Sequence, residues 1–173
     1  MKLSELKPGN RFKNELGEFI VLGHDGDHTK VIMSGLYEES VRFGNTCNYM
    51  DSSLKRMFDE AITPEFEKVF GDALIEHEVD LVSVDMQQYG RFKCKVRPIT
   101  FDEARGFNEL LVNKNLPDWY WTCTPWSTKE RGWDYSVAVV SPSGGFSHDD
   151  CDDCCGARPF CILKSDIFVS LED

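Results

Sequence analysis

One short segment of the sequence gathers side chains that bind transition metals. It reads His148-Asp149-Asp150-Cys151-Asp152-Asp153-Cys154-Cys155, and Cys161 follows a few residues later. Cys151 and Cys154 have the Cys-x-x-Cys spacing of a zinc knuckle, and His148 or Cys161 can complete a tetrahedral site with the soft ligands that zinc accepts. These four residues are the candidate metal ligands.

The same segment has an interpretation without a metal. If it continues as a strand, alternate side chains face opposite sides of the sheet, so that Cys151 and Cys154 point apart. The sequence also lacks a second pair of ligands at similar spacing. The cysteines then pack as small apolar residues or lie free at the surface. We favour this interpretation and no cofactor, and keep zinc as the alternative.

Patterns typical of catalysis are missing from the sequence. A nucleophilic Ser or Cys needs a nearby His and an acid that orients it. The four histidines instead lie in a predicted turn, between elements and beside an acidic run: His24, His28, His77 and His148. The sequence has no glycine-rich phosphate loop, Walker lysine or His-Glu-x-x-His motif. We therefore expect no catalytic residues.

Composition limits the class of protein and its partners. The chain has 173 residues, which fits one domain over residues 1–173. Its net charge of −11 disfavours direct contact with nucleic acid or anionic lipid. No apolar run approaches the roughly 20 residues that span a bilayer, and the N-terminus lacks a signal-peptide core. We expect a cytoplasmic protein whose seven cysteines remain thiols.

The first half of the chain predicts a β-hairpin followed by two helices. The β-branched runs 18–23 and 30–33 flank an Asp-Gly turn, which is typical of a hairpin. Asp51 or Ser52 can cap a helix with one apolar face. Thr63, followed by a proline, predicts the N-cap of a second helix directly afterwards.

The second half predicts further strands and one more helix. Residues 79–85 and 91–97 alternate in polarity, and the basic residues of the second run give one face a positive charge. Thr100 and Glu103 have the spacing of a capping box for the third helix. Glycines 144 and 145 predict the turn of a hairpin.

The closing strand of the sequence contains an arginine with an expected structural role. It begins Gly156-Ala157-Arg158-Pro159 and follows an aromatic strand at 118–126. We expect the Arg158 guanidinium to pair with an interior carboxylate or with carbonyl oxygens. Arg158 is therefore interpreted as a structural residue and not as an anion-binding one.

Together these segments resemble a domain family of uncharacterised function that is common in Firmicutes and their phages. The matching segments are Asp51–Phe58, Tyr120–Trp126, Val137–Val140 with Gly144-Gly145, and Gly156–Pro159. The resemblance covers nearly the whole chain and is most specific in its final third. It implies an α+β fold similar to the C-type-lectin-like domain, with mainly antiparallel strands and two to three short helices. Formylglycine-generating enzymes share that fold.

A fold of this kind supports several functions, so the residues must discriminate between them. The Glu-Pro-Asn, Gln-Pro-Asp and Trp-Asn-Asp tripeptides of calcium-dependent sugar-binding lectins do not occur here. The paired active-site cysteines of formylglycine-generating enzymes have no residue-by-residue match. The resemblance therefore implies neither calcium-bound sugar recognition nor oxidase chemistry.

We expect a non-catalytic recognition module of phage or prophage origin that binds another protein through loops of its C-terminal sheet. The candidate binding residues are aromatic, basic or acidic: Trp126, Lys129, Arg131, Trp133, Asp149, Asp150, Asp152 and Asp153. An acidic surface suits a basic host protein, and an anti-defence role against a CRISPR nuclease is one version. The alternatives are a metal- or cysteine-dependent enzyme related to formylglycine-generating oxidases, or a structural virion component.

Overall fold

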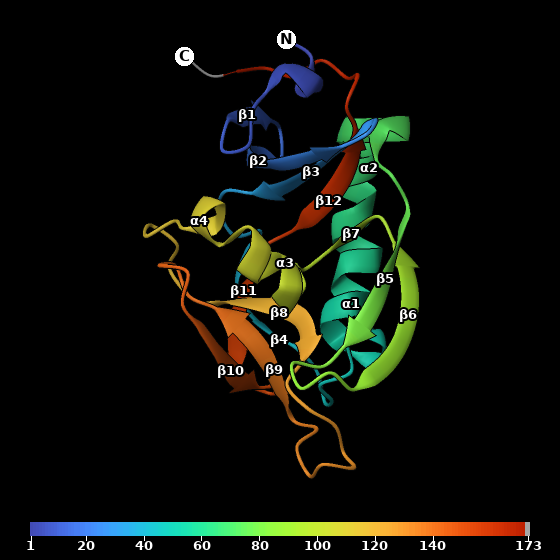
Figure 1. Cartoon of the computed structure of the whole chain (residues 1–173), viewed down its shortest axis with the longest axis vertical. Coiled ribbons are helices and arrows are strands. Elements are labelled where there is room, and N and C mark those ends of the chain that lie inside the picture. The colour runs from blue at the N-terminus through green and yellow to red at the C-terminus, as the bar shows by residue number, and fades with distance from the viewer. Residues whose placement is uncertain (172–173) are drawn as a thin grey trace.

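The computed structural model describes residues 1–171 and shows an α+β protein built mainly from antiparallel strands (Figure 1). The α+β class predicted from the sequence is confirmed. The strands are β1 (Arg11–Asn14), β2 (Gly17–Asp25), β3 (His28–Met33), β4 (Glu38–Arg42), β5 (His77–Val82), β6 (Gln88–Cys94), β7 (Val96–Arg97), β8 (Tyr120–Pro125), β9 (Ser136–Val140), β10 (Phe146–Asp150), β11 (Cys154–Ala157) and β12 (Phe160–Lys164). The helices are α1 (Ser53–Met57), α2 (Thr63–Phe70), α3 (Phe101–Gly106) and α4 (Asn108–Leu111), with a π-helical turn at Phe58–Ile62 and 3-10 turns at Leu3–Glu5, Tyr49–Asp51 and Gly71–Ala73.

The first five-stranded sheet has the order β1-β2-β3-β12-β7 and lies at the top and centre of Figure 1. The predicted hairpin forms its middle, since β2 and β3 pair in antiparallel fashion around Gly26. Gly26 has a φ of 59°, which glycine adopts without steric strain. The closing strand β12 then pairs with β3.

The second five-stranded sheet has the order β10-β9-β8-β11-β4, so β10 is an edge strand. β9 and β10 form the hairpin that the sequence predicts at its paired glycines. β11 runs parallel to β8, with Gly156 opposite Tyr120. β5 and β6 form a separate hairpin beside the α1–α2 helix (Figure 1).

The chain is helical without a break from Ser53 to Phe70, where the sequence predicts two helices. Ser52 caps the start, and its hydroxyl accepts a hydrogen bond from the third helical N–H at 3.0 Å. The prediction that Thr63 is an N-cap is wrong, because its hydroxyl donates to the Phe58 carbonyl oxygen at 2.7 Å. The π-helical turn widens the helix there, so it continues past a proline that has no N–H.

Both sheets contribute to one main hydrophobic core. It includes Phe19 of β2, Trp121 of β8 and Phe58 of the helix, all fully buried. A smaller cluster packs residues of the first sheet, such as Ile32 of β3, against the α3–α4 region and the second sheet, with Leu111 and Tyr120 among its members. Among residues 1–171, no helix combines the length and the apolar character that crossing a bilayer requires.

Arg158 links the two sheets where the chain passes from β11 to β12. Its fully buried guanidinium donates to the carbonyl oxygens of Met33 at 2.8 Å and Ser34 at 3.0 Å. It also donates to the Leu111 carbonyl oxygen at 2.8 Å and the Tyr120 hydroxyl at 3.0 Å. The structural role predicted for Arg158 is therefore confirmed, with carbonyl oxygens as the main partners.

Candidate functional site

β10 presents alternate side chains to solvent along the edge of the second sheet. Phe146, His148 and Asp150 are exposed, whereas Ser147 and Asp149 are partly buried. The pairing of β10 with β9 continues along the strand without a register shift. One face of β10 therefore carries an aromatic ring, an imidazole and a carboxylate in succession.

The loop between β8 and β9, residues 126–135, projects at the bottom of Figure 1 and places its rings against His148. The His148 ring centroid lies 4.6 Å from that of Trp126 and 5.3 Å from that of Trp133. Trp133 stacks on Tyr135 at 6.3 Å. Trp133 is 36% exposed and Tyr135 51%. We call Trp126, Trp133, Tyr135 and His148 the aromatic cluster.

Trp133 is held in place by its own loop. Its backbone N–H donates to the Thr128 carbonyl oxygen at 2.9 Å, and its indole N–H donates to the Ser136 hydroxyl at 3.0 Å. Gly132, directly before it, has a φ of 76° that favours glycine. Because these contacts fix the ring before a partner arrives, binding to it loses little conformational entropy.

Asp85 braces the same loop from the turn of the β5–β6 hairpin. Its carboxylate accepts hydrogen bonds from the hydroxyls of Ser83 and Ser127, the latter at 2.6 Å, and from the Arg131 guanidinium at 3.3 Å. Desolvation raises the pKa of Asp85, but the hydrogen bonds from Ser127 and Ser83 and the charge of Arg131 outweigh it and lower that pKa. Arg131 therefore orients the loop.

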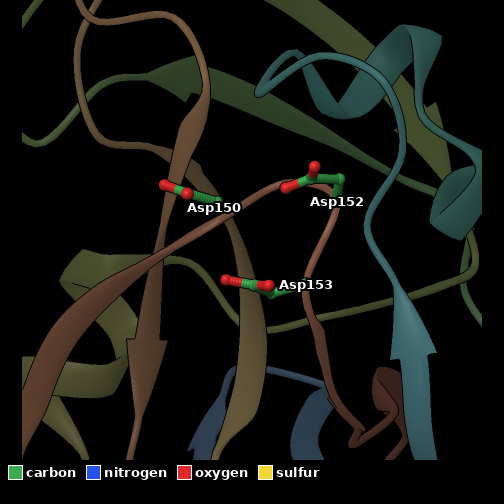
Figure 2. Close-up of side chains that lie close together, drawn as sticks. All are labelled: Asp150, Asp152 and Asp153. Atoms are coloured by element: carbon green, nitrogen blue, oxygen red, sulfur yellow. The ribbon is translucent and has the colours of Figure 1, made fainter.

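Four aspartates surround the turn that joins β10 to β11. Figure 2 shows three of them gathered there, and the carboxylate oxygens of Asp150, Asp152 and Asp153 lie within 4.8 Å of one another. Among residues 1–171, no carboxylate of this turn forms an ion pair within 4.0 Å. We call Asp149, Asp150, Asp152 and Asp153 the acidic turn.

Hydrogen bonding and charge repulsion between its carboxylates change the protonation behaviour of the acidic turn. A hydrogen bond with Asp149, followed by the charge of that residue, raises the pKa of Asp153. The Cys155 thiol donates to the Asp149 carboxylate at 3.3 Å, and burial together with this contact raises the pKa of the thiol. A cationic partner would relieve the repulsion between these carboxylates.

The structure does not bring the four predicted metal ligands together. Within residues 1–171, one group of three or more potential metal ligands has its ligand atoms within 4.8 Å of one another. That group is the three carboxylates of Figure 2 and includes none of the predicted ligands. His148 packs on Trp126, Cys154 is exposed, and Cys151 is buried in the main core. Cys161 is fully buried in β12, in the other sheet. Cys151 and Cys154 are separated by a turn and do not share the continuous strand that the sequence suggests.

A second group of titratable side chains surrounds Arg97, which the sequence groups with the basic residues of one positively charged face. That placement is wrong, because Arg97 is buried and forms a bidentate ion pair with Glu103 at 2.7 and 3.0 Å. Its Nε donates to His77 Nε2 at 3.0 Å. Burial raises the pKa of nearby Cys94 to about 11 and that of Cys123 to about 12, so both thiols stay protonated near neutral pH.

A shallow hollow of about 430 Å³ lies between the β5–β6 hairpin and α3, with Met86, Phe101 and Arg105 among its lining residues. The Phe101 ring contacts the Phe146 ring of β10, with centroids 5.2 Å apart. Met86 has a φ of 68° and is 75% exposed. The hollow therefore extends the exposed face of β10 away from the acidic turn.

Comparisons with protein-family models, with curated proteins and with solved structures find no match to this chain. The geometry of the site therefore carries the functional interpretation. Exposed rings beside uncompensated carboxylates can bind a guanidinium or ammonium group, since the rings attract its charge and the carboxylates accept its hydrogen bonds.

Some of the candidate binding residues lie on the exposed surface around β10, and others hold the β8–β9 loop in place. The structure gathers Trp126, Trp133 and the acidic turn around β10, and Lys129 is exposed at the loop tip. Sequence reasoning missed Tyr135, Phe146 and Asp85 as parts of this surface. In the sequence, Asp85 stands at the end of the alternating run 79–85. The structure ends β5 earlier, at Val82, and Asp85 lies in the turn that follows.

Proposed function

We propose that this protein is a non-catalytic recognition module that binds an arginine- or lysine-rich segment of another protein. The binding surface comprises the aromatic cluster, Phe146 and the acidic turn. The observation that carries the proposal is the position of Trp133, which is exposed but fixed by two hydrogen bonds. Its indole N–H donates to the Ser136 hydroxyl, which donates in turn to the carboxylate of Asp150 in the acidic turn at 3.4 Å.

The chemistry of arginine suits both halves of this surface. A guanidinium stacks on the face of tryptophan or tyrosine and donates paired hydrogen bonds to a carboxylate. The net charge of −11 also increases the rate at which a basic partner encounters the protein. A peptide with several cations can therefore contact Trp133, Tyr135 and the acidic turn together.

The state of the buried thiols supports a binding function over cysteine chemistry. Burial raises the pKa of Cys47, Cys151 and Cys161, as it does for the thiols around Arg97. A raised pKa keeps sulfur in the protonated form, which is a poor nucleophile and a poor metal ligand. The enzyme alternative thus has less support than the recognition module.

We extend the proposal to fold family and biological setting. The mainly antiparallel α+β architecture supports the C-type-lectin-like interpretation, which otherwise depends on the matched segments of the sequence. In a phage-derived setting, the partner is a basic nucleic-acid-handling host defence protein, such as a CRISPR nuclease. The test is competition: an excess of this protein should reduce DNA binding by the purified nuclease, and unchanged DNA binding would contradict this setting.

Isothermal titration calorimetry tests the binding function. The probes are a synthetic arginine-rich peptide and a glutamate-rich peptide of equal length. We expect only the first to bind, and Trp133→Ala to weaken it by about thirtyfold, the size of an interface hot spot. Trp119→Ala is the matched control, because Trp119 is 37% exposed at the other end of β8. Equal affinity of the two variants would contradict the proposed surface.

A further inference from the structure

The backbone of β10 has one paired edge and one open edge. The Ser141 N–H donates to the Gly145 carbonyl oxygen at 2.8 Å, and the Cys151 N–H donates to the Tyr135 carbonyl oxygen at 2.7 Å. These bonds fix the alternation of the antiparallel ladder, so the odd-numbered residues of β10 direct their N–H and C=O groups toward β9. Phe146, His148 and Asp150 direct theirs away from it.

The open edge has a defined length. Within residues 1–171, β10 pairs with β9 alone, and its far side has no strand beside it. At Asp150, the N–H donates to the carboxylate of Asp149 at 3.0 Å, and the carbonyl oxygen accepts from the N–H of Asp153 at 3.0 Å. The backbone groups left for another strand are therefore those of Phe146 and His148.

Most edge strands carry features that prevent pairing with another chain, such as proline, lysine or a β-bulge. β10 reads Phe-Ser-His-Asp-Asp and has none of these, and its register with β9 is continuous. Its protection is negative charge, which repels another acidic chain and attracts a basic one. The open edge therefore favours pairing with a basic segment over pairing with an acidic one.

We propose that the partner segment binds by strand addition, pairing its backbone with Phe146 and His148 at the open edge of β10. This inference rests on the proposed function and specifies its geometry. Residues two apart in a strand are separated by roughly 7 Å, so alternate side chains of the added segment face the exposed side of β10. An apolar residue near Phe146 and a basic residue near Asp150 define the expected pattern.

A second copy of this chain is a poorer occupant of the same edge. Each chain carries a net charge of −11, so self-association brings two strongly negative molecules together. Pairing two β10 strands would also desolvate Asp150 without supplying a cation to either acidic turn. Charge complementarity thus selects a basic segment.

Backbone N-methylation of the peptide tests strand addition. The probes are a peptide that carries valine and arginine four residues apart, to lie beside Phe146 and Asp150, and two derivatives, each N-methylated at one alternate set of residues. In strand addition only one set of N–H groups faces β10, so we expect one derivative to lose affinity by about tenfold or more and the other to bind like the parent. Equal affinity of both derivatives would overturn strand addition.

Two variants at one position give an independent readout. His148→Pro removes the outward N–H, which an edge strand tolerates, whereas His148→Ala removes the ring and keeps the N–H. We expect His148→Pro to bind the unmodified peptide several-fold more weakly than His148→Ala, with both folded by circular dichroism. Equal binding would again overturn strand addition.

The failure of the two proposals can be distinguished. If the unmodified peptide does not bind, or Trp133→Ala has no effect, the proposed function fails. If the peptide binds and Trp133→Ala weakens it, but the N-methylated derivatives behave alike, only strand addition fails. Concentration-dependent dimers in analytical ultracentrifugation that His148→Pro abolishes would identify a second copy as the occupant and overturn the basic-segment proposal.

Discussion

The Arg131 guanidinium lies 3.3 Å from the Asp85 carboxylate and thereby ties the β8–β9 loop to the turn of the β5–β6 hairpin. The same carboxylate accepts a hydrogen bond from Ser127 at the start of the loop. The loop that presents Trp133 is therefore oriented from outside the binding surface. Support of this kind distinguishes residues that position a site from residues that contact the partner.

Asp85→Asn should loosen the loop. We expect the free energy of unfolding to fall by about 1 kcal/mol, a modest value because Arg131 is half exposed and solvent screens the pair. The affinity for the arginine-rich peptide should fall several-fold, as measured by calorimetry. Glu78→Gln is the control, since Glu78 forms an exposed ion pair with Arg91 at 3.3 Å and does not line the hollow beside Phe101. Equal peptide affinity in both variants would show that Asp85 does not position the loop.

The contribution of Asp85 should also depend on pH. Its pKa is lowered in the folded protein, so its ionised form stabilises the fold above its ordinary value of 3.8. That stability is lost as the pH falls through the lower, folded-state pKa. The difference between wild type and Asp85→Asn in urea unfolding should therefore disappear in acid, and a difference that persists would contradict an electrostatic origin.

Glu103→Gln should destabilise the protein strongly. Burial raises the pKa of Glu103, but the hydrogen bonds and charge of Arg97 outweigh it and lower that pKa. Removing the charge leaves a buried guanidinium without its counter-ion, which typically costs about 3 kcal/mol. We expect this loss in urea unfolding above pH 4.5, and its disappearance as the pH falls through the folded-state pKa of Glu103.

A matched exposed pair provides the control for that prediction. Asp102 and Arg105 also form an ion pair, at 2.8 Å, but both side chains are largely exposed. Asp102→Asn should change the free energy of unfolding by less than about 0.5 kcal/mol. Similar losses in the Asp102 and Glu103 variants would contradict the role assigned to burial.

The sequence predicted local features well because their causes are local. The capping box of α3 forms as predicted: the Thr100 hydroxyl accepts from the Glu103 N–H at 3.1 Å, and the Glu103 carboxylate accepts from the Thr100 N–H at 2.9 Å. Four neighbouring residues contain all of that information. The pairing of Glu103 with Arg97 needs β7 to leave the β5–β6 hairpin and join β12, which the alternating polarity of residues 91–97 does not reveal.

The candidate site was predictable only in part for the same reason. Trp133 and the acidic turn stand out in the sequence as exposed aromatic and charged segments. Their connection through the Ser136 hydroxyl depends on the register of β9 and β10, in which Asp150 lies opposite Ser136. The cysteine pattern was misleading, because a turn between Cys151 and Cys154 sends one thiol into the core and leaves the other exposed.

His77 should make stability rise with pH in the mildly acidic range. Its Nδ1 bonds to the Ile75 carbonyl oxygen at 3.1 Å, and its Nε2 accepts from Arg97, so the neutral ring fits the site. Burial, and then the charge of Arg97, lowers its pKa from 6.5 to about 4. Between pH 4 and pH 6.5, the unfolded chain therefore binds a proton at His77 that the folded chain does not bind. The free energy of unfolding decreases as the pH falls through this range.

Urea unfolding between pH 4 and 7 measures this effect. The wild type should lose up to about 3 kcal/mol across the range relative to His77→Gln, which cannot titrate. The amide of glutamine can still accept a hydrogen bond from Arg97, so the variant should fold. Parallel pH dependence of the two proteins would show that folding does not change the pKa of His77.

Met86→Gly should stabilise the protein. Met86 has a φ of 68°, where side chains other than glycine are strained by about 1 kcal/mol or more. Its side chain is 75% exposed, so removing it sacrifices little packing, and its N–H bond to the Ser83 carbonyl oxygen is kept. After the greater entropy of glycine in the unfolded chain is allowed for, we expect a gain of about 0.5–1 kcal/mol in urea unfolding.

Met86→Ala separates backbone strain from loss of the side chain, because alanine keeps the strain. It should not be stabilised, and a gain equal to that of Met86→Gly would contradict the strain interpretation. The same two variants address binding, since Met86 lines the hollow beside Phe101. If the apolar end of the added segment reaches that hollow, both variants should weaken the arginine-valine peptide equally while differing in stability.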